Sequence, residues 1–402
     1  MKNIVKGLAL SVVASSVVVA GGYKIPEQSL NSMALGAAYV AHTTSADTAY
    51  FNPANMAFMG DGQFMEGGIT LAHLPSNVYS LGSASGNSEE ENMLIPNFHY
   101  VSAPMGDFRW GVSLTVPGGL TKRWETPYQK AFAEEFTLKI IELSPSVSYK
   151  INNNFSVGGG LRLIYSEGIV KSNARGIGMP LQVDMEGDTV EFGYNLAMTY
   201  KPTDDVIVAA TYRSNVDLDE DGSATITYPI GSPTGTTITS DAGVSVPLPA
   251  AFNVAISKTW GGTFTLEAGY ERTFWSEYET LEFTGTNLPI TQKNWEDSNT
   301  YRIGATVEMD KLTVMMGFAI DETPVPVESI GFELPDSDAK IFSMGFRYQQ
   351  TENLSWGLAF LYDSKDSISM QRGVSENPVL TKGGSFHEGG AYLTTIGMGY
   401  KF

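Results

Sequence analysis

The stretch Glu191-Phe-Gly-Tyr-Asn-Leu-Ala-Met-Thr-Tyr200 alternates strictly between two kinds of side chain. Aromatic and aliphatic residues occupy its even positions, and Glu, Gly, Asn, Ala and Thr occupy its odd positions. Successive side chains of a β-strand point to opposite faces, so a period of two predicts a strand with one apolar and one polar face. The stretch therefore predicts a strand that separates two different environments.

The same alternation recurs along the chain after Gln63, for example at 155–165 and 301–309. It marks fourteen segments, an even number, as in outer-membrane β-barrels. The predicted strands are residues 62–74, 92–104, 107–119, 135–151, 154–172, 181–201, 205–216, 248–260, 262–274, 298–310, 311–321, 339–350, 353–363 and 386–402.

The connections between these segments alternate in length. Tight turns are predicted at Met105-Gly106, Asn152-Asn153, Thr203-Asp204, Gly261, Asp310-Lys311 and Thr351-Glu352. Long polar loops are predicted at 75–91, 120–134, 173–180, 217–247, 275–297, 322–338 and 364–385. Short turns at one rim and long loops at the other predict an all-β, antiparallel up-and-down barrel of the outer-membrane type.

The composition of the two strand faces fits a membrane barrel. The apolar faces are rich in Phe, Tyr, Trp and Met, often near segment ends, which is typical of aromatic girdles. Charges on the polar faces are expected to point into the lumen, because Lys or Arg at the lipid midplane costs ~2–4 kcal/mol. An open sheet edge cannot lie in hydrocarbon, so the strands are expected to close into a barrel.

The overall charge and the absence of cysteine narrow the function classes. A formal net charge of -19 argues against nucleic acid as a partner, because nucleic acid requires a basic surface. The chain has 0 cysteines, so sheet closure or core packing must replace disulfides. No stretch approaches the ~18 apolar residues that indicate a membrane-spanning helix.

Residues 21–60 differ from the rest of the chain and are interpreted as a plug, or hatch, inside the barrel formed by residues 61–402. The segment Ser29–Ala41 is small and apolar, with Leu30, Met33, Ala34, Ala37 and Ala41 at helix-like spacing. Asn52-Pro53 then predicts a turn, because the residue before proline avoids the α region. A mostly apolar segment ahead of a long β array needs a place to be buried, and the lumen is that place.

Both ends of the chain carry export signals. Residues 1–20 have a basic start, a short apolar core and small residues at Val18-Val19-Ala20, which predicts a secretory signal peptide cleaved before Gly21. The ending Thr395-Ile-Gly-Met-Gly-Tyr-Lys-Phe402 resembles the assembly signal of Gram-negative outer-membrane proteins. We therefore expect a multi-pass protein of that membrane, recognised by the assembly machinery through Phe402.

Taken together, the chain resembles the FadL family of outer-membrane transporters for long-chain fatty acids and other hydrophobic compounds. The most specific motif is Asn52-Pro53-Ala54, with Asp47 upstream, and Gly21-Gly22-Tyr23 resembles the mature start of the family. The resemblance covers nearly the whole chain. It implies a passive, monomeric transporter that binds a fatty acid or hydrocarbon and contacts outer-membrane lipid and lipopolysaccharide.

The family resemblance also implies a mechanism in which outer loops capture the substrate and the wall releases it sideways into the bilayer. The opening lies at a kink in the third strand, for which Pro117-Gly118-Gly119 and Gly111 are the candidates. Proline removes a ladder donor and glycine permits bends. The alternative interpretation is that Pro117-Gly118-Gly119 simply ends the strand.

Two further groups of residues are candidates for substrate contact. In the fatty-acid transporters of the family a basic residue beyond the fifth strand meets the carboxylate, and Lys171 or Arg175 could serve here. A neutral hydrocarbon would need neither. Four aromatic residues follow the third strand at a spacing of four, and a helix over 126–135 would place them on one face, as a lid or as direct ligand contacts; they are Trp124, Tyr128, Phe132 and Phe136.

No catalytic, cofactor or metal motif is recognised. Asp217–Gly222 matches the first half of a calcium loop, but Tyr228 occupies the position where that pattern requires Glu. The stretch is therefore interpreted as a solvated acidic loop. Two alternative functions remain: a water-filled porin, against which the apolar plug argues, and a lipase-like enzyme, for which no Ser, His and acid arrangement is found.

Overall fold

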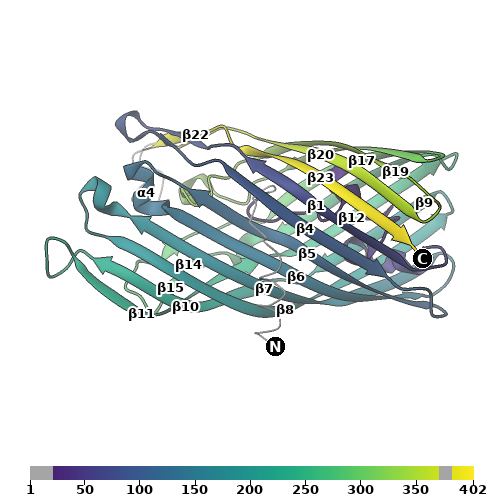
Figure 1. Ribbon diagram of the computed structural model, residues 1–402, viewed down its shortest axis with the longest axis horizontal. Coiled ribbons are helices and arrows are strands. Elements are labelled where there is room, and N and C mark those ends of the chain that lie inside the picture. The colour runs from purple at the N-terminus through teal and green to yellow at the C-terminus, as the bar shows by residue number, and fades with distance from the viewer. Residues whose placement is uncertain (1–20, 371–382) are drawn as a thin grey trace.

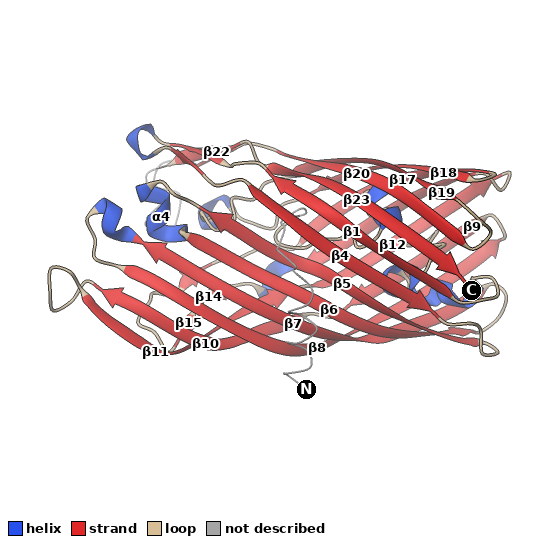
Figure 2. Cartoon of the chain, viewed as in Figure 1, coloured by secondary structure: helices blue, strands red, loops and turns tan. Residues whose placement is uncertain are grey.

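The computed structural model describes residues 21–370 and 383–402, so the predicted signal peptide at 1–20 lies outside the described residues. The described chain is a 14-stranded antiparallel β-barrel with the N-terminal segment inside, which confirms the predicted fold class (Figure 1, Figure 2). The barrel closes because β1 pairs with β4 on one side and with β23 on the other. The wall strands are, in order, β1 (Phe64–Leu74), β4 (Glu91–Val101), β5 (Phe108–Arg123), β6 (Glu135–Lys150), β7 (Phe155–Asn173), β8 (Gln182–Thr203), β9 (Val206–Arg213), β12 (Ala250–Trp260), β13 (Phe264–Phe274), β17 (Ser298–Met309), β18 (Leu312–Asp321), β19 (Ala339–Gln349), β20 (Leu354–Lys365) and β23 (Gly390–Lys401).

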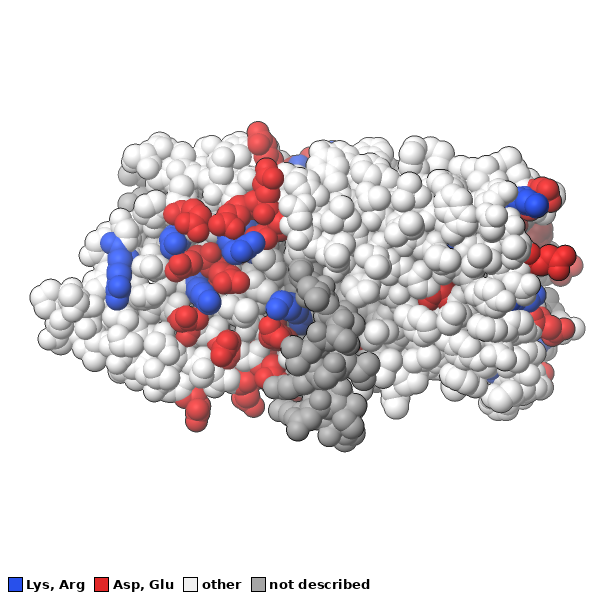
Figure 3. All heavy atoms as spheres, in the orientation of Figure 1, with Lys and Arg blue, Asp and Glu red and all other residues white. Residues whose placement is uncertain are grey.

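The alternation of side chains sorts into an outer and an inner face as expected. Leu161 and Phe192 are each 66% exposed on the outside of the wall, whereas Arg162 and Ser166 are buried on the inside. Figure 3 shows a broad belt of the outer surface almost without charged residues, with charges gathered near the end that carries α4 (Pro127–Ala133) and at the opposite rim. This belt matches the hydrocarbon layer of a bilayer. No helix of the described chain is long and apolar enough to cross a membrane.

The prediction of a loop at 217–247 is wrong for most of that range, because the residues form two strands. Residues Val216–Tyr228 form β10 and residues Thr236–Leu248 form β11, and the two strands pair along their whole length. Together they extend the wall beyond β9 and β12, and β10 also pairs with the outer half of β8. Inward positions such as Leu218 and Ile226 are apolar and buried, but the outward positions are polar. The acidic stretch Asp217–Asp221 therefore lies on a strand that continues past the lipid, and not in a loop.

The plug consists of three short helical pieces joined by turns inside the barrel. They are α2 (Leu30–Ala34), α3 (Thr48–Phe51) and η1 (Pro53–Phe58). Ser29 caps α2 with a reciprocal side-chain bond to Ser32, and the helix stops well before Ala41. It stops there because Gly36 and Ala37 take left-handed conformations, with φ of 56° and 59°. The apolar spacing of Ser29–Ala41 thus reflects burial on several sides and not one long helix.

The plug contacts the wall closely at several glycines of the barrel strands. A Cβ atom at Gly317 of β18 would lie 2.1 Å from the backbone of Leu35, so the wall must present glycine there. Glu267 of β13 accepts three backbone hydrogen bonds from the plug, from Val40, Ala41 and His42, at 2.6, 3.0 and 2.7 Å. A single buried carboxylate therefore holds a whole turn of the plug.

We expect Glu267→Ala to loosen the plug, because one buried and two half-buried N–H groups would lose their acceptor, at a cost of up to ~1–3 kcal/mol for a buried group. The measurement is steady ionic current through the purified protein in planar bilayers, which should rise in the variant. Glu308→Ala, at the exposed end of β17, is the control and should leave the current unchanged. Equal currents in the wild type and Glu267→Ala would show that Glu267 does not fix the plug.

Candidate functional site

The third barrel strand, β5, is interrupted by a bulge. It pairs regularly with β6 up to Thr115 opposite Glu142, and pairing resumes at Gly118 opposite Ile140. Val116 and Pro117 therefore face the single residue Ile141, so one extra residue bends the strand. The strand continues to Arg123, so the predicted glycines do not end it.

The bulge coincides with a missing part of the ladder between β4 and β5. These strands pair over four residues only, from Phe98 opposite Leu114 to Val101 opposite Gly111. Nearer the long loops, no ladder pairing joins the two strands, over residues 91–97 of β4 and 115–122 of β5. The segment that precedes β4 meets the outer end of β5, where Glu89 N donates to Arg123 O at 2.9 Å. We call this unpaired stretch of the wall the window.

The N-terminal segment of the plug takes the place of β4 at the bulge. Ile25 N donates to Pro117 O, and Gly119 N donates to Tyr23 O, each at 2.9 Å. The Gln28 side chain bonds both the N–H and the carbonyl of Val116, at 2.9 and 2.8 Å. The backbone groups that the bulge removes from the wall are thus satisfied from inside the lumen.

Gly111, the other candidate for the kink, lies in regular pairing below the window. A Cβ atom there would lie 2.7 Å from the Cβ of Ala49 and 2.9 Å from the sulfur of Met56. Its role in this geometry is to leave room for the plug. The bend itself lies between Thr115 and Gly118.

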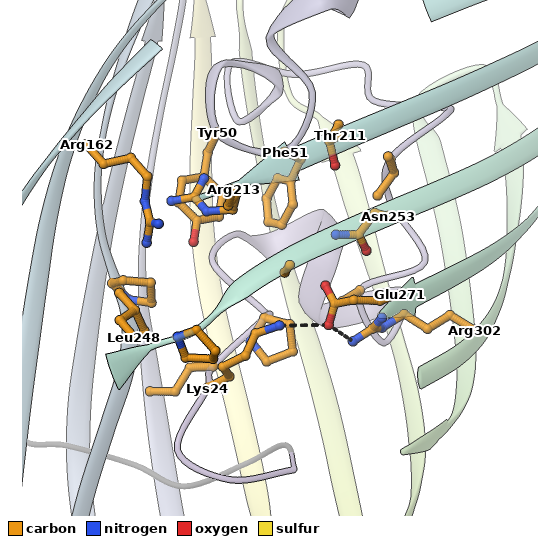
Figure 4. A pocket seen from close by; sticks show the side chains of 17 residues that line it. Lys24, Tyr50, Phe51, Arg162, Thr211, Arg213, Leu248, Asn253, Glu271 and Arg302 are labelled. Atoms are coloured by element: carbon orange, nitrogen blue, oxygen red, sulfur yellow. Dashed lines mark hydrogen bonds and ion pairs between the residues drawn. The ribbon is translucent and has the colours of Figure 1, made fainter. Parts of the chain in front are cut away.

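A cavity of about 80 Å³ lies in the lumen beside the bulge (Figure 4). Plug residues and wall residues line it together, and Pro117 belongs to its wall. Basic side chains enter it from two sides, whereas Tyr50, Phe51 and Leu248 supply apolar surface. The basic residues are Lys24, Arg162, Arg213 and Arg302. We call this cavity the inner pocket.

The charges around the inner pocket are only partly balanced. Lys24 and Arg302 share Glu271, at 2.9 and 3.4 Å. Arg162 and Arg213 share the fully buried Glu142, and the Arg162 Nη2 to Glu142 Oε2 distance is 2.9 Å.

We assign the unbalanced positive charge to Arg213. Its Nη1 has no hydrogen-bond partner, and its guanidinium lies 4.3 Å from the centre of the Tyr50 ring. Two guanidinium groups and one carboxylate leave a positive charge in a low-dielectric site, which favours an anionic ligand. Arg302 differs, because the acids Asp321 and Glu27 also lie near it.

A second, aromatic pocket lies nearer the long loops, and we call it the outer chamber. It encloses only about 20 Å³ and is lined mainly by Tyr23, Leu120, Phe136, Tyr278, Trp295 and Leu334. Lys293 also lines it and forms a buried ion pair with Glu333. A long ligand could enter only if side chains moved, because the chamber is almost filled.

A helix does form within the expected range, as α4 at Pro127–Ala133, but it carries only Tyr128 and Phe132 of the four aromatic residues at a spacing of four. Trp124 directly follows β5 and Phe136 lies on β6, so the prediction of one shared helical face is wrong. Trp124 is fully buried and donates from Nε1 to the carbonyl of Phe332 at 2.8 Å. Tyr128 and Phe132 place their rings 6.1 and 6.0 Å from that of Phe332. Phe136 lines the chamber itself. Their arrangement is that of a lid packed on the rim.

The N-terminal segment separates the two pockets. Tyr23 lines the outer chamber and the next residue, Lys24, lines the inner pocket. The ring of Tyr23 packs edge-on against Trp275, with centroids 4.8 Å apart. Tyr23 and Lys24 therefore lie between the outer chamber and the inner pocket.

The predicted plug motif holds the plug together instead of facing a pocket. Asn52 Nδ2 donates to Val40 O and Thr199 Oγ1 at 2.8 and 2.9 Å, and its Oδ1 accepts from Ala54 N at 3.2 Å. Asp47 accepts from Tyr39 Oη at 3.0 Å, and burial raises the pKa of its carboxyl to about 7. Pro53 starts η1 directly after the turn at Asn52.

The two basic residues predicted to meet a carboxylate do not reach the inner pocket. Lys171 has the same parity on β7 as the lipid-exposed Leu161, so it points outward, where Glu135 and Asp184 lie 3.7 and 3.9 Å away. Arg175 is exposed in the short helix η3 (Ala174–Ile177). Sequence reasoning missed the luminal residues Lys24, Arg162 and Arg213.

Comparison with known proteins gives a consistent answer. The family model described as outer membrane protein transport protein (OMPP1/FadL/TodX) matches residues 11–402. A long-chain fatty acid transport protein of Escherichia coli strain K12 is 26% identical over 360 residues, covering 77% of this chain and 80% of that protein. Outer membrane protein P1 of Haemophilus influenzae is 24% identical over 376 residues, covering 78% and 80%.

Solved structures show the same fold. The structure of a Pseudomonas aeruginosa FadL homologue has a TM-score of 0.82 at 18% identity, covering 95% of this chain and 99% of that one. The Pseudomonas putida toluene transporter TodX has a TM-score of 0.72 at 16% identity, covering 96% and 100%. The family model matches nearly the whole chain, and the barrel is the one that these solved structures share. The chain therefore belongs to the OMPP1/FadL/TodX family of outer membrane transport proteins.

Proposed function

We propose that this protein carries long-chain fatty acids through the outer membrane. The outer chamber and its lid capture the apolar chain, the inner pocket holds the carboxylate at Arg213, and the window releases the molecule sideways into the bilayer. The observation that carries this proposal is the bulge at Val116-Pro117, which lies beside the inner pocket and is paired to the plug instead of to β4.

Release into the bilayer fits the chemistry of a fatty acid. Each CH₂ group that stays out of water contributes ~0.8 kcal/mol, so a long alkyl chain gains nothing by leaving through the rim with the short turns. The sideways route needs a break in the backbone ladder, because a closed ladder leaves no passage between strands. A neutral hydrocarbon would use the same route without the carboxylate contact.

The proposal is tested by uptake of radiolabelled oleate in cells that lack their own fatty acid transporter and express this chain. We expect saturable uptake, together with no steady ionic current from the purified protein in planar bilayers. A large steady current without oleate uptake would identify a porin for polar solutes. Uptake of toluene with no uptake of oleate would retain the route and replace the carboxylate ligand with a neutral one.

A further inference from the structure

The backbone nitrogen of Gly21 lies among buried carboxylates at the outer end of the plug. Gly21 N donates to Asp321 Oδ2, and Gly22 N donates to Asp336 Oδ2 at 2.9 Å. Asp321 and Asp336 are 3% and 1% exposed. Two separate parts of the barrel, the end of β18 and the loop after it, thus converge on the first two described residues.

These carboxylates have too few cationic partners. Asp363 of β20 is 0% exposed, and neither of its oxygens has a hydrogen-bond partner. Glu27 makes no side-chain hydrogen bond to another residue, and burial raises the pKa of its carboxyl to about 8. Lys365 Nζ lies 2.6 Å from Asp336 Oδ1, and Arg302 is shared with Glu271. The charged groups around the site are Glu27, Arg302, Asp321, Asp336, Asp363 and Lys365.

A further positive charge would satisfy this cluster, because a buried carboxylate without a partner destabilises the fold. The predicted cleavage after Ala20 supplies one at the right atom. Hydrolysis by a signal peptidase breaks the peptide bond between Ala20 and Gly21, and water adds OH to the Ala20 carbonyl carbon and a proton to the Gly21 nitrogen. That nitrogen changes from an amide with one N–H to an amine that takes up a further proton and becomes an ammonium with three.

We propose that the α-ammonium group of mature Gly21 is bound by Asp321, with Asp336 and Asp363 as the neighbouring carboxylates, and anchors the N-terminal segment across the window. The two glycines make this approach possible. A Cβ at Gly21 would lie 2.7 Å from Glu322 O. Gly22 has a φ of 74°, and a Cβ there would lie 2.5 Å from the Trp275 ring. The anchor lies directly before Tyr23 and Ile25, which hold the bulge, and it does not depend on which substrate is carried.

The test is titration of the α-amine in the mature protein in detergent, after the N-terminus has been confirmed as Gly21 by intact mass. Labelling with 2-¹³C-glycine gives the Gly21 α-carbon an NMR signal that follows protonation of the amine, and it leaves the three N–H donors intact. We expect its pKa to lie about one unit or more above the ordinary value of about 8, because three carboxylates stabilise the charged form. Asp321→Asn and Asp363→Asn should lower this pKa, and Asp310→Asn, in a turn at the opposite rim, should not.

A second variant keeps the test decisive if an aspartate variant does not fold. One alanine inserted before Gly21 moves the amine by ~3.5 Å along the chain, which should return its pKa to the ordinary value. Heat-modifiable migration on gels reports that each barrel is folded. An amine with an ordinary or lowered pKa in the wild type, unchanged by the insertion, would overturn the proposal. No substrate is present in this experiment, so its result is separate from that of the uptake assay.

Discussion

Deletion of Pro117 is expected to abolish most uptake while leaving the barrel folded. The deletion removes the extra residue of the bulge, so Thr115 and Gly118 would pair with β6 in one continuous register. Leu120 and Lys122 would keep their inward direction, and β5 would present a regular edge to 91–97 of β4. A continuous ladder closes the window, so oleate uptake should fall by about tenfold or more.

The matched control for the deletion is Pro117→Ala, which keeps the number of residues and therefore the bulge. Uptake by this variant should stay close to that of the wild type. Both proteins should bind oleate in detergent, because Arg213 of the inner pocket and the residues of the outer chamber are unchanged. Full uptake by the deletion variant, with a folded barrel on gels, would show that substrate does not leave through the window.

Replacement of Arg213 by Gln is expected to separate fatty acids from neutral compounds. The variant keeps one guanidinium, Arg162, for the single carboxylate of Glu142, so the buried pair stays balanced. It removes the unpartnered Nη1 that we assign to the substrate carboxylate. A hydrogen bond to a charged group contributes ~1.5–3 kcal/mol, so oleate affinity should fall by about 10- to 100-fold.

Methyl oleate distinguishes this effect from a general loss of binding. It has nearly the same shape as oleate but no charge, and its affinity should be almost the same in Arg213→Gln and the wild type. Arg175→Gln, which changes an exposed residue, is the control for charge removal and should bind both ligands normally. Equal losses for oleate and methyl oleate would contradict a carboxylate site at Arg213.

The strands of the wall could be predicted from the sequence because lipid-facing positions must be apolar, whereas the lumen-facing positions between them are small or polar. Strands such as 191–200 alternate throughout the lipid layer, so their number and order were recognisable. The strands β10 and β11 were missed since they stand above the lipid, where outward residues such as Asp219 are polar. In that region one face of each strand packs inside the barrel and the other faces water, so the sequence is polar overall and resembles that of a loop.

The site was harder to predict because it joins residues that are distant in sequence. The spacing of the aromatic residues indicated a helix at the rim, and α4 lies there with Tyr128 and Phe132, although Trp124 precedes it. Lys24 and Arg213 come together only through the position of the plug, which no local pattern records. The parity of Lys171 with Leu161 on one strand was present in the sequence, and counting it would have placed Lys171 on the outer face.

The most direct test of the release route is the map of positions that a photoreactive fatty acid labels during uptake by living cells. A diazirine near the end of the alkyl chain marks the residues that it passes. We expect labels on Ile25 and Pro117 and on 91–97 of β4, and we expect them to be lost when Pro117 is deleted. Labels confined to the short turns at Met105-Gly106 and Asn152-Asn153, and unchanged by the deletion, would contradict sideways release through the window.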